Sequence, residues 1–455
     1  MLLKLTNNHL PVLTVLMEGH PLIVLLNPRL RLLPSNLSQP RRSDPSKHLR
    51  RNKNSTFDFP ADPFPFPHTS RLSPYLHNWT LITNDIWVLN IITSGYRLEF
   101  TRLPPLGQVS LTSFDLLLEE EICTLLQKGA IQVVPSKDIL DGFYSRYFLV
   151  PKKDGGLRPI LDLRDLNKFL AVRKFKMVTL ESIIHLLRQG DWFMVVDLKD
   201  AYFHITIHKS HRKYLRLLFN NIVYQFAALP FGLSTAPRTF TKCMAPVAAY
   251  LRLQGIQVYP YIDDWLIVSK SKHQALQDTQ YVLHTLQALG LTINQEKSKL
   301  SPSQFVDYIG ARIDSVQAQM FMPPDRIQKI LKAIKKFKPN ARVKAKLAQH
   351  LLGLMASTMA TLSHARLKMR SLQVWMLSHF SPLHDSQSKR LTVTPELAQQ
   401  LLWWTFRPHL LVGRSFHPLQ LTTQVTTDAS PLGWGAHCEG HQIHALWSPQ
   451  ENSYT

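Results

Sequence analysis

The sequence Y-I-D-D-W-L-I-V at residues 261–268 places two adjacent acids inside an apolar run that is typical of a buried strand. Adjacent carboxylates repel each other and resist burial, so Asp263 and Asp264 need a compensating cation. If the two acids form a tight turn between two strands, both side chains can approach one metal site. An ordinary Asp-Asp hairpin turn is the alternative, and the dipeptide alone does not separate the two interpretations.

A third acid has a similar setting. Asp197 ends the apolar run F-M-V-V at 193–196, and an acid at the end of a buried strand is costly unless it is paired or bound to metal. If the two strands are neighbours, three carboxylates meet on one patch, which suits oxygen-loving Mg²⁺. Two such ions about 4 Å apart can hold the attacking and leaving oxygens of an in-line phosphoryl transfer. We interpret Asp200 as a helix-start residue rather than a ligand.

Two further segments have the character of loops near such a site. L-P-F-G-L-S-T-A-P at 229–237 enters a helix predicted over 234–255, and Gly232 would let the backbone approach a base or sugar closely. Upstream, Asp154-Gly155-Gly156 predicts a hairpin turn that is flanked by the cations Lys152, Lys153 and Arg158. Such a hairpin could hold the triphosphate of a nucleotide. A structural turn and a solvated charged hairpin are the alternatives.

Charge points to a polyanionic partner. The chain of 455 residues has 53 Lys and Arg against 31 Asp and Glu, a net charge of +22, which favours nucleic acid over a charge that serves solubility alone. Its three cysteines lie far apart, so neither a zinc site nor a disulfide framework is indicated, and a reducing compartment fits. We expect no transmembrane span, no signal peptide and no membrane partner, and hence an intracellular protein of the cytoplasm or nucleus that is not secreted.

Composition also divides the chain. Residues 34–75 are rich in Pro, Ser, Asn and Arg and predict a linker. Residues 111–315 alternate strand-like and helix-like runs, an α+β pattern with one dominant core. Residues 321–405 are mostly helical and basic, and the pattern returns to strand near residue 421.

The order of these motifs resembles the reverse transcriptase family. The basic hairpin is followed by D-L-K-D-A-Y-F, L-P-F-G-L-S-T-A-P and Y-I-D-D, then by L-T-I-N with Lys297, and last by F-V-D-Y-I-G at 305–310. The series covers about 165 residues in the family's order. Trp265 after Y-I-D-D, and the segment at 190–240, look most like retrotransposons of the DIRS group, with caulimovirus-like and Ty-gypsy-like polymerases as the nearest alternatives. The resemblance implies a right-hand polymerase of fingers, palm and thumb with an antiparallel palm sheet.

The resemblance also implies roles for individual residues. Asp197, Asp263 and Asp264 match the catalytic metal ligands for two Mg²⁺ ions, with Mn²⁺ as the alternative, and the Leu198 carbonyl matches a further ligand. Tyr202 matches the aromatic gate that excludes a ribose 2′-hydroxyl. The remaining nucleotide-binding positions are Lys153 and Arg158 for the triphosphate, Phe231 and Gly232 for the loop on the nucleotide, and Lys297 for the leaving pyrophosphate. Many retroviral relatives have Gln where Phe231 stands.

The resemblance extends to the flanking parts of the chain. We expect an N-terminal region at 1–110, fingers and palm at 111–318, and a helical thumb and connection at 319–415 whose lysines contact phosphates. T-T-D-A-S-P-L-G-W-G-A at 426–436 resembles the opening strands of a ribonuclease H domain, with Asp428 as its first metal-binding acid. We therefore expect a truncated ribonuclease H-like start at 421–455, without ribonuclease H activity.

The expected function is that of an RNA-directed DNA polymerase of a retrotransposon. It would extend a primer on an RNA or DNA template with deoxynucleoside triphosphates. An RNA-templated RNA polymerase is one alternative, which Tyr202 disfavours because such an enzyme must admit the 2′-hydroxyl. A catalytically dead nucleic-acid-binding remnant of a retroelement is the other, which the three intact acids disfavour.

Overall fold

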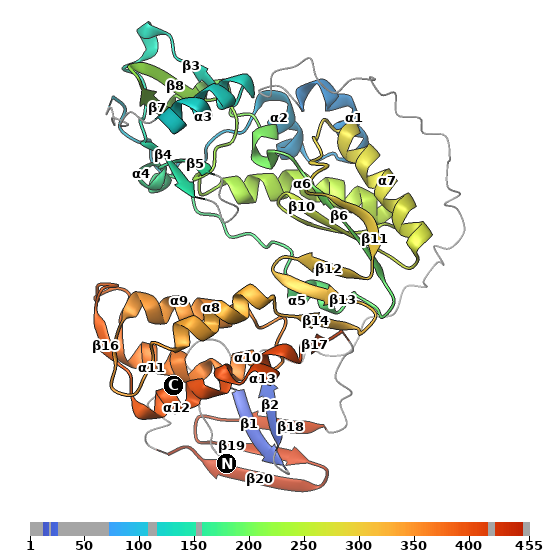
Figure 1. Ribbon diagram of the computed structural model, residues 1–455, viewed down its shortest axis with the longest axis vertical. Helices are drawn as coiled ribbons and strands as arrows, with labels where there is room; N and C mark the ends of the chain where they lie inside the picture. Colours follow the sequence, from blue (N-terminus) through green and yellow to red (C-terminus); the bar gives the residue numbers. More distant parts are fainter. Residues whose placement is uncertain are drawn as a thin grey trace, which may run out of the picture. The chain divides into compact units, whose positions relative to one another are not determined.

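Asp197 is the last residue of β6 and Asp264 the first residue of β10. These strands are neighbours in a four-stranded antiparallel sheet of the order β11-β6-β10-β9, of which Figure 1 labels β11, β6 and β10. Its strands are β6 (Trp192–Asp197), β9 (Gln257–Tyr261), β10 (Asp264–Ser269) and β11 (Lys299–Ser303). The computed structural model describes residues 72–107, 116–151, 157–416 and 424–448, apart from the side chains of 116, 151 and 157–159. It also describes the backbone of 12–17 and 20–25.

Both faces of this sheet are buried, which explains the continuous apolar runs of β6 and β10. Along β6, Met194 and Val196 face one hydrophobic cluster, whereas Phe193 and Val195 face another. Side chains alternate in the same way on β10, where Trp265 and Ile267 join the first cluster and Leu266 and Val268 the second.

Two long helices cover the first face. They are α6 (Ala236–Leu253) and α7 (Lys272–Ala288). The helix expected at 234–255 is confirmed, with Pro237 in its first turn and Gly255 at φ +82° after its end. Thr235 is its N-cap residue, but its side chain accepts no capping hydrogen bond.

The buried apolar residues of the segment 72–107 belong to the same cluster. The segment forms η2 (Ser73–Tyr75), α1 (Leu76–Ile82) and α2 (Ile86–Ser94), and the fully buried Trp79 donates its indole N–H to the carbonyl of Leu289 at the end of α7, at 3.0 Å. Asp85 caps α2 by accepting from the N–H groups of Trp87 and Val88. The sequence had suggested no role for this segment, and the structure shows that it completes the core around α6 and α7.

Smaller sheets surround α3 (Leu116–Gln127) and the loops of the candidate site. One has the order β3-β8-β7, formed by β3 (Ile131–Val133), β7 (Arg216–Phe219) and β8 (Ile222–Phe226). The predicted hairpin is confirmed as β4 (Tyr147–Pro151) paired with β5 (Leu157–Leu161), and α4 (Arg164–Asn167) follows it. Short 3₁₀ helices complete this part: η3 (Ser136–Asp138), η4 (Ala201–His204) and η5 (Lys209–Tyr214).

The second face of the main sheet packs on α5 (Leu180–Ile184) and on a further antiparallel sheet. That sheet has the order β12-β13-β14-β17. Its strands are β12 (Phe305–Tyr308), β13 (Ala311–Asp314), β14 (Gln319–Phe321) and β17 (Arg414–Ser415).

The predicted helical region has its own hydrophobic cluster. Its helices are α8 (Pro324–Ile334), α9 (Ala345–Ala356), α10 (Ala365–Lys368), α11 (Arg370–His379), α12 (Pro395–Leu401), η6 (Leu402–Thr405) and α13 (Arg407–Leu411). A two-stranded ribbon, β15 (Arg342–Lys344) with β16 (Arg390–Thr392), lies among them.

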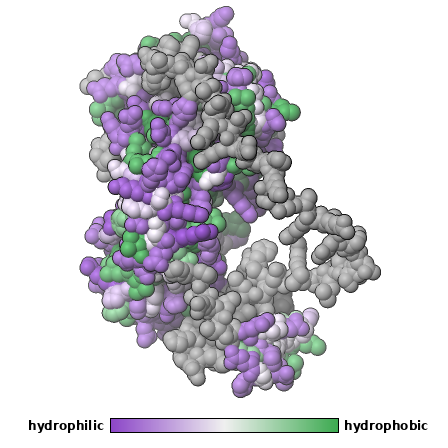
Figure 2. Space-filling model, turned by 90° about the vertical axis from the view of Figure 1, so that its right-hand side faces the viewer, coloured by the Kyte–Doolittle hydropathy of each residue, from purple (hydrophilic) through white to green (hydrophobic). Residues whose placement is uncertain are grey.

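Two sheets involve the ends of the chain. The backbone of β1 (Val12–Met17) pairs with β2 (His20–Leu25). The strand expected near residue 421 is β18 (Val425–Ala429), and it pairs with β19 (Gly433–Cys438), which pairs with β20 (His441–Leu446). On the face shown in Figure 2, hydrophilic residues cover most of the described surface and hydrophobic ones form small scattered groups. None of the described helices is long and apolar enough to cross a bilayer.

Candidate active site

Asp197 and Asp264 lie directly opposite each other on β6 and β10. Because side chains alternate along a strand, both belong to the face of Phe193 and Val195, at the end where the apolar run stops. Asp197 is 8% exposed, and Asp264 is half-buried. The two acid-bearing strands are thus neighbours, which was the condition for the acids to meet on one patch.

The two carboxyl groups cannot both carry a free charge at low cost. Burial, together with the neighbouring charges of Asp263 and Asp197, raises the pKa of Asp264 to about 6. Burial and the charge of Asp263 also raise the pKa of Asp197, while the cation of Lys297 opposes the shift at both acids. The contact between the two side chains contributes to the raised pKa of Asp264 and opposes the rise at Asp197, so the proton of the pair is held by Asp264.

A two-residue turn presents Asp263. Tyr261 pairs with Asp264, so Ile262 and Asp263 alone connect β9 to β10. Ile262 has φ +55°, a conformation that a β-branched residue adopts only under strain, and such strain is concentrated at functional sites. The main-chain carbonyl of Asp263 accepts a hydrogen bond from Leu198 N–H at 2.9 Å, which fixes the turn against the end of β6 while the Asp263 side chain is exposed.

A loop at 292–298 supports the end of β6. Asn294 N–H donates to the Asp197 carbonyl at 2.8 Å, and Asp197 N–H donates to the Ser298 hydroxyl at 3.0 Å. The Ser298 hydroxyl in turn donates to the Asn294 carbonyl at 2.6 Å. Sequence reasoning missed Ser298, because nothing in its local pattern shows that it meets a strand 101 residues away. Among the described residues, no hydrogen bond reaches the carbonyl oxygen of Leu198.

The fit of a metal ion can be judged from the donors themselves. Among the described side chains, no three His, Cys, Asp or Glu residues are close enough together to form a finished metal site. Asp197 and Asp264 nevertheless present carboxylate oxygens, and a divalent cation would replace the proton that their raised pKa values favour. The chemistry of the pair fits a hard cation, and the complete ligand set remains a prediction.

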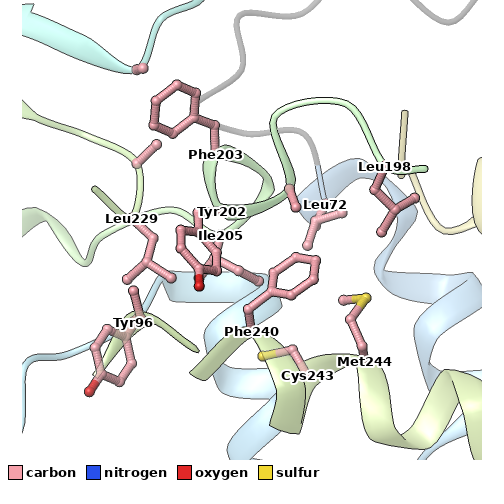
Figure 3. Packing of buried hydrophobic residues seen from close by; sticks show 14 of the residues in the cluster. Leu72, Tyr96, Leu198, Tyr202, Phe203, Ile205, Leu229, Phe240, Cys243 and Met244 are labelled. Atoms are coloured by element: carbon pink, nitrogen blue, oxygen red, sulfur yellow. The ribbon is translucent and has the colours of Figure 1, made fainter. Parts of the chain in front are cut away.

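An aromatic cluster adjoins the carboxylates. Tyr202 on η4 is 7% exposed, and its ring centroid lies 5.1 Å from that of Phe231 and 5.8 Å from that of Phe240. Figure 3 shows the Tyr202 ring among Leu229, Ile205 and Phe240. Burial raises the pKa of Tyr202 to about 12, and the charge of Asp263 contributes, so the phenol is near the acids and neutral.

The loop at 230–235 packs closely on strand β5 and is hydrogen-bonded to Asn167. Gly232 has φ +101°, and a Cβ atom there would lie 2.4 Å from the carbonyl oxygen of Leu161, so only glycine fits. The Asn167 amide donates to the Gly232 carbonyl at 2.9 Å and accepts from Ser234 N–H at 2.9 Å. The close approach predicted for Gly232 is thus made to strand β5, and its approach to a nucleotide stays a prediction. Asn167 is a second residue that the sequence did not indicate.

The structure describes the remaining predicted residues only in part. Lys153 and the turn at 154–156 are outside the described residues, as are residues 34–71 of the expected linker. Arg158 lies on β5, and only its backbone is described. Asp428 lies on β18, opposite Gly435.

One segment of the chain matches a known protein family. Residues 150–313 match the family model of "Reverse transcriptase (RNA-dependent DNA polymerase)". This segment contains β6, β9, β10, the three acids and the loop at 230–235. This segment of the chain is therefore similar to reverse transcriptases.

Particular relatives come from retroelements and a virus. The chain is similar to the Transposon Tf2-3 polyprotein of Schizosaccharomyces pombe, with 32% identity over 164 residues, 36% of this chain and 12% of that protein. It is also similar to the putative enzymatic polyprotein of Cassava vein mosaic virus, with 27% identity over 289 residues, 60% of this chain and 42% of that protein. The chain thus spans only part of the length of these relatives.

Solved structures show the same fold. The foamy viral protease-reverse transcriptase in complex with dsDNA matches with a TM-score of 0.54 at 19% identity, over 78% of this chain and 74% of that one. A second structure of that viral protein, dRH in complex with dsDNA, matches with a TM-score of 0.57 at 18% identity, over 78% of this chain and 60% of that one. At this identity the likeness establishes a polymerase fold with mixed helices and antiparallel sheets.

Proposed function

We propose that the chain is an RNA-directed DNA polymerase of a retrotransposon, which adds deoxynucleotides to a primer on an RNA or DNA template. The observation that carries the proposal is the pairing of Asp197 with Asp264 across β6 and β10, next to the turn of Asp263, inside the reverse transcriptase domain. The relatives that match this domain are polyproteins of a transposon and a virus.

Asp197, Asp263, Asp264 and the carbonyl of Leu198 would hold two Mg²⁺ ions, with Mn²⁺ as the alternative. When bound, such ions act as Lewis acids on the attacking and leaving oxygens of an in-line phosphoryl transfer. The strand pairing keeps Asp197 and Asp264 in register, and the Leu198–Asp263 hydrogen bond keeps the turn beside them. The protein's contribution is this fixed geometry, which limits reorganisation during the reaction.

The neighbouring residues would bind the nucleotide. Tyr202 would lie below the sugar and exclude a 2′-hydroxyl, with Phe231 and Gly232 beside it. Lys153 and Arg158 would hold the triphosphate, since cations form short, strong hydrogen bonds with phosphate oxygens. Lys297, whose charge acts on both Asp197 and Asp264, would donate a proton to the leaving pyrophosphate.

The helical region would bind the template–primer duplex through phosphates, without reading sequence. The exposed cations along α8 and the β15–β16 ribbon support this role: Lys329, Lys332, Lys335, Lys336, Lys338, Arg342, Lys344 and Lys346. Lys344 lies directly opposite Arg390 on the ribbon. Like charges opposite each other destabilise a sheet, and a bound polyanion would relieve that repulsion.

Two narrower assignments belong to the same proposal. The DIRS group is proposed from Trp265 after Y-I-D-D and from the segment at 190–240. A ribonuclease H-like start is proposed from the three-stranded antiparallel sheet whose first strand, β18, carries Asp428.

Primer extension tests the function. The full chain is incubated with a homopolymer RNA template, a complementary DNA primer, the matching deoxynucleoside triphosphate and Mg²⁺. Extension that requires both RNA template and Mg²⁺ supports the proposal. Template binding without extension at any divalent ion would support the catalytically dead remnant instead, and preferential incorporation of ribonucleotides would support the RNA polymerase.

A further inference from the structure

An ion pair links the turn before Tyr202 to the end of a different element. The ammonium of Lys128, which follows α3, lies 3.1 Å and 3.0 Å from the two carboxylate oxygens of Asp200. The Lys128 side chain is 29% exposed and that of Asp200 is 21% exposed, so both charges are largely shielded from water. Such a pair is less screened than one on the open surface.

Asp200 has an unusual backbone. It adopts the left-handed conformation, with φ 52° and ψ 44°, immediately before the 3₁₀ turn η4 that carries Tyr202. Asp tolerates this region when its short side chain bonds to nearby backbone, and it commonly caps a helix in that way. Here the Asp200 side chain makes no capping hydrogen bond to η4. Its carboxylate is directed to Lys128 instead.

The rest of the segment is fixed at both ends. Lys199 N–H donates to the Thr292 carbonyl at 2.9 Å, and the ring of His204 lies 2.9 Å from Thr292 N and 3.1 Å from the Ala201 carbonyl. Between these anchors, the side chain of Asp200 reaches a residue outside the loop at 292–298. The ion pair with Lys128 is therefore placed to set the rotation of η4, and hence the position of the Tyr202 ring.

We propose that Lys128 is a positioning residue for sugar selection, which acts through Asp200 on Tyr202. The proposal rests on the proposed polymerase function and on Tyr202 as the gate. The ion pair keeps the left-handed turn in place, so that Tyr202 stays packed on Phe231 and Phe240. Without the ion pair, the Tyr202 ring moves more freely and excludes a ribose 2′-hydroxyl less effectively.

The test compares kcat/KM for a deoxynucleotide and the matching ribonucleotide in the full chain. Lys128→Met keeps the length of the side chain and removes its charge. We expect discrimination against the ribonucleotide to fall on the order of tenfold, which corresponds to about 1.4 kcal/mol. KM for the deoxynucleotide should rise more than kcat falls, because the β6–β10 pairing that holds Asp197 and Asp264 does not involve Lys128. Lys128→Arg keeps the charge and should retain the wild-type ratio.

A double variant separates positioning from stability. Lys128→Met alone leaves Asp200 unpaired and lowers the melting temperature, whereas Lys128→Met with Asp200→Asn removes both charges and keeps a residue that tolerates the left-handed turn. The double variant should recover stability and still show the same loss of discrimination as Lys128→Met. The discrimination ratio of the double variant also tests the role of Lys128 if Lys128→Met alone does not fold.

Lys213→Met is the matched control. Lys213 lies 3.0 Å from Asp141, with the lysine side chain 30% exposed, but Asp141 is remote in sequence from η4. This control should keep the wild-type ratio. A folded double variant that extends primers with unchanged discrimination would overturn the role of Lys128 and leave the polymerase function standing. A wild-type chain that extends no primer would overturn the proposed function itself.

Discussion

Asp197 and Asp264 are cross-strand partners on β6 and β10, and both lie at the end of a sheet that is buried on both faces. Two carboxyl groups on directly paired residues resist simultaneous ionisation unless a cation binds both of them. The relationship leads to predictions about catalysis, pH and metal dependence.

Asp264→Asn should abolish Mg²⁺-dependent primer extension and leave template–primer binding largely intact. An amide keeps the shape of the side chain but provides only one weak metal-binding oxygen. Steady-state extension and a binding titration on the same preparation measure the two effects. Asp307→Asn, at an exposed acid on β12 that pairs with Arg312, is the control and should retain extension. Undiminished extension by Asp264→Asn would remove Asp264 from the catalytic site.

Stability without metal should fall as pH rises toward 6. The pKa of Asp264 is raised from 3.8 to about 6 in the folded chain, so the folded state binds more protons than the unfolded state between those values. The free energy of unfolding therefore decreases as pH rises through this window and levels off above about pH 6. Thermal unfolding across pH should show this slope, and Asp264→Asn should reduce it.

Mg²⁺ should raise the melting temperature above pH 6 and have little effect at pH 4, because the ion and the proton on Asp264 compete for the same oxygens. The comparison uses one buffer series with Mg²⁺ or an equal ionic strength of Na⁺. A stabilisation by Mg²⁺ that is the same at both pH values would show that the ion binds elsewhere.

Tyr202→Val should raise ribonucleotide incorporation relative to deoxynucleotide incorporation. The phenol ring packs against Phe231 and Phe240, and its removal opens space beside the acids. Competitive incorporation opposite one template base measures the ratio. Tyr250→Val, at a half-buried tyrosine on α6 whose hydroxyl contacts that of Tyr281, tests whether loss of any tyrosine has the effect. A ratio that Tyr202→Val leaves unchanged would place the gate at another residue.

Duplex binding should weaken steeply with salt, with a slope of roughly −0.9 per phosphate contacted on duplex DNA. Changing Lys332, Lys335 and Lys336 to Gln should flatten the slope and weaken all sequences alike, because phosphate contacts carry no sequence information. Lys272→Gln, at an exposed position of α7, is the control for loss of a single positive charge. An unchanged slope in the triple variant would show that Lys332, Lys335 and Lys336 do not contact the duplex phosphates.

The chain should not cleave RNA in an RNA–DNA hybrid. Ribonuclease H chemistry needs metals held by several carboxylates. Across residues 424–448 the acids are Asp428 and Glu439, and no group there is arranged to hold an ion. A labelled hybrid incubated with Mg²⁺ and without nucleotides gives the answer. Cleavage that disappears in Asp428→Asn would show that this sheet belongs to a working nuclease.

The sequence alone indicated the strands and the acids because the pattern there is local. Continuous apolar runs at 193–196 and 265–268 predict strands buried on both faces, and an acid that ends such a run is conspicuous. Helix α6 was predicted from Pro237 in its first turn and Gly255 after its end, which are also local signals. The order of the motifs added the family resemblance, and the family match at 150–313 supports it.

Only the tertiary structure decided which distant residues meet. Ser298 contacts Asp197, Asn167 holds Gly232, and Lys128 pairs with Asp200, over separations of 101, 65 and 72 residues. Each contact depends on where a loop returns to the sheet, and a serine, asparagine or lysine in such a loop has the same local pattern as one that faces solvent. The packing of the segment 72–107 has the same explanation, because the end of α7 that receives the Trp79 side chain does not exist until the chain has folded. Hydrophobic periodicity thus determines the elements, whereas the partners of polar side chains are set by packing between them.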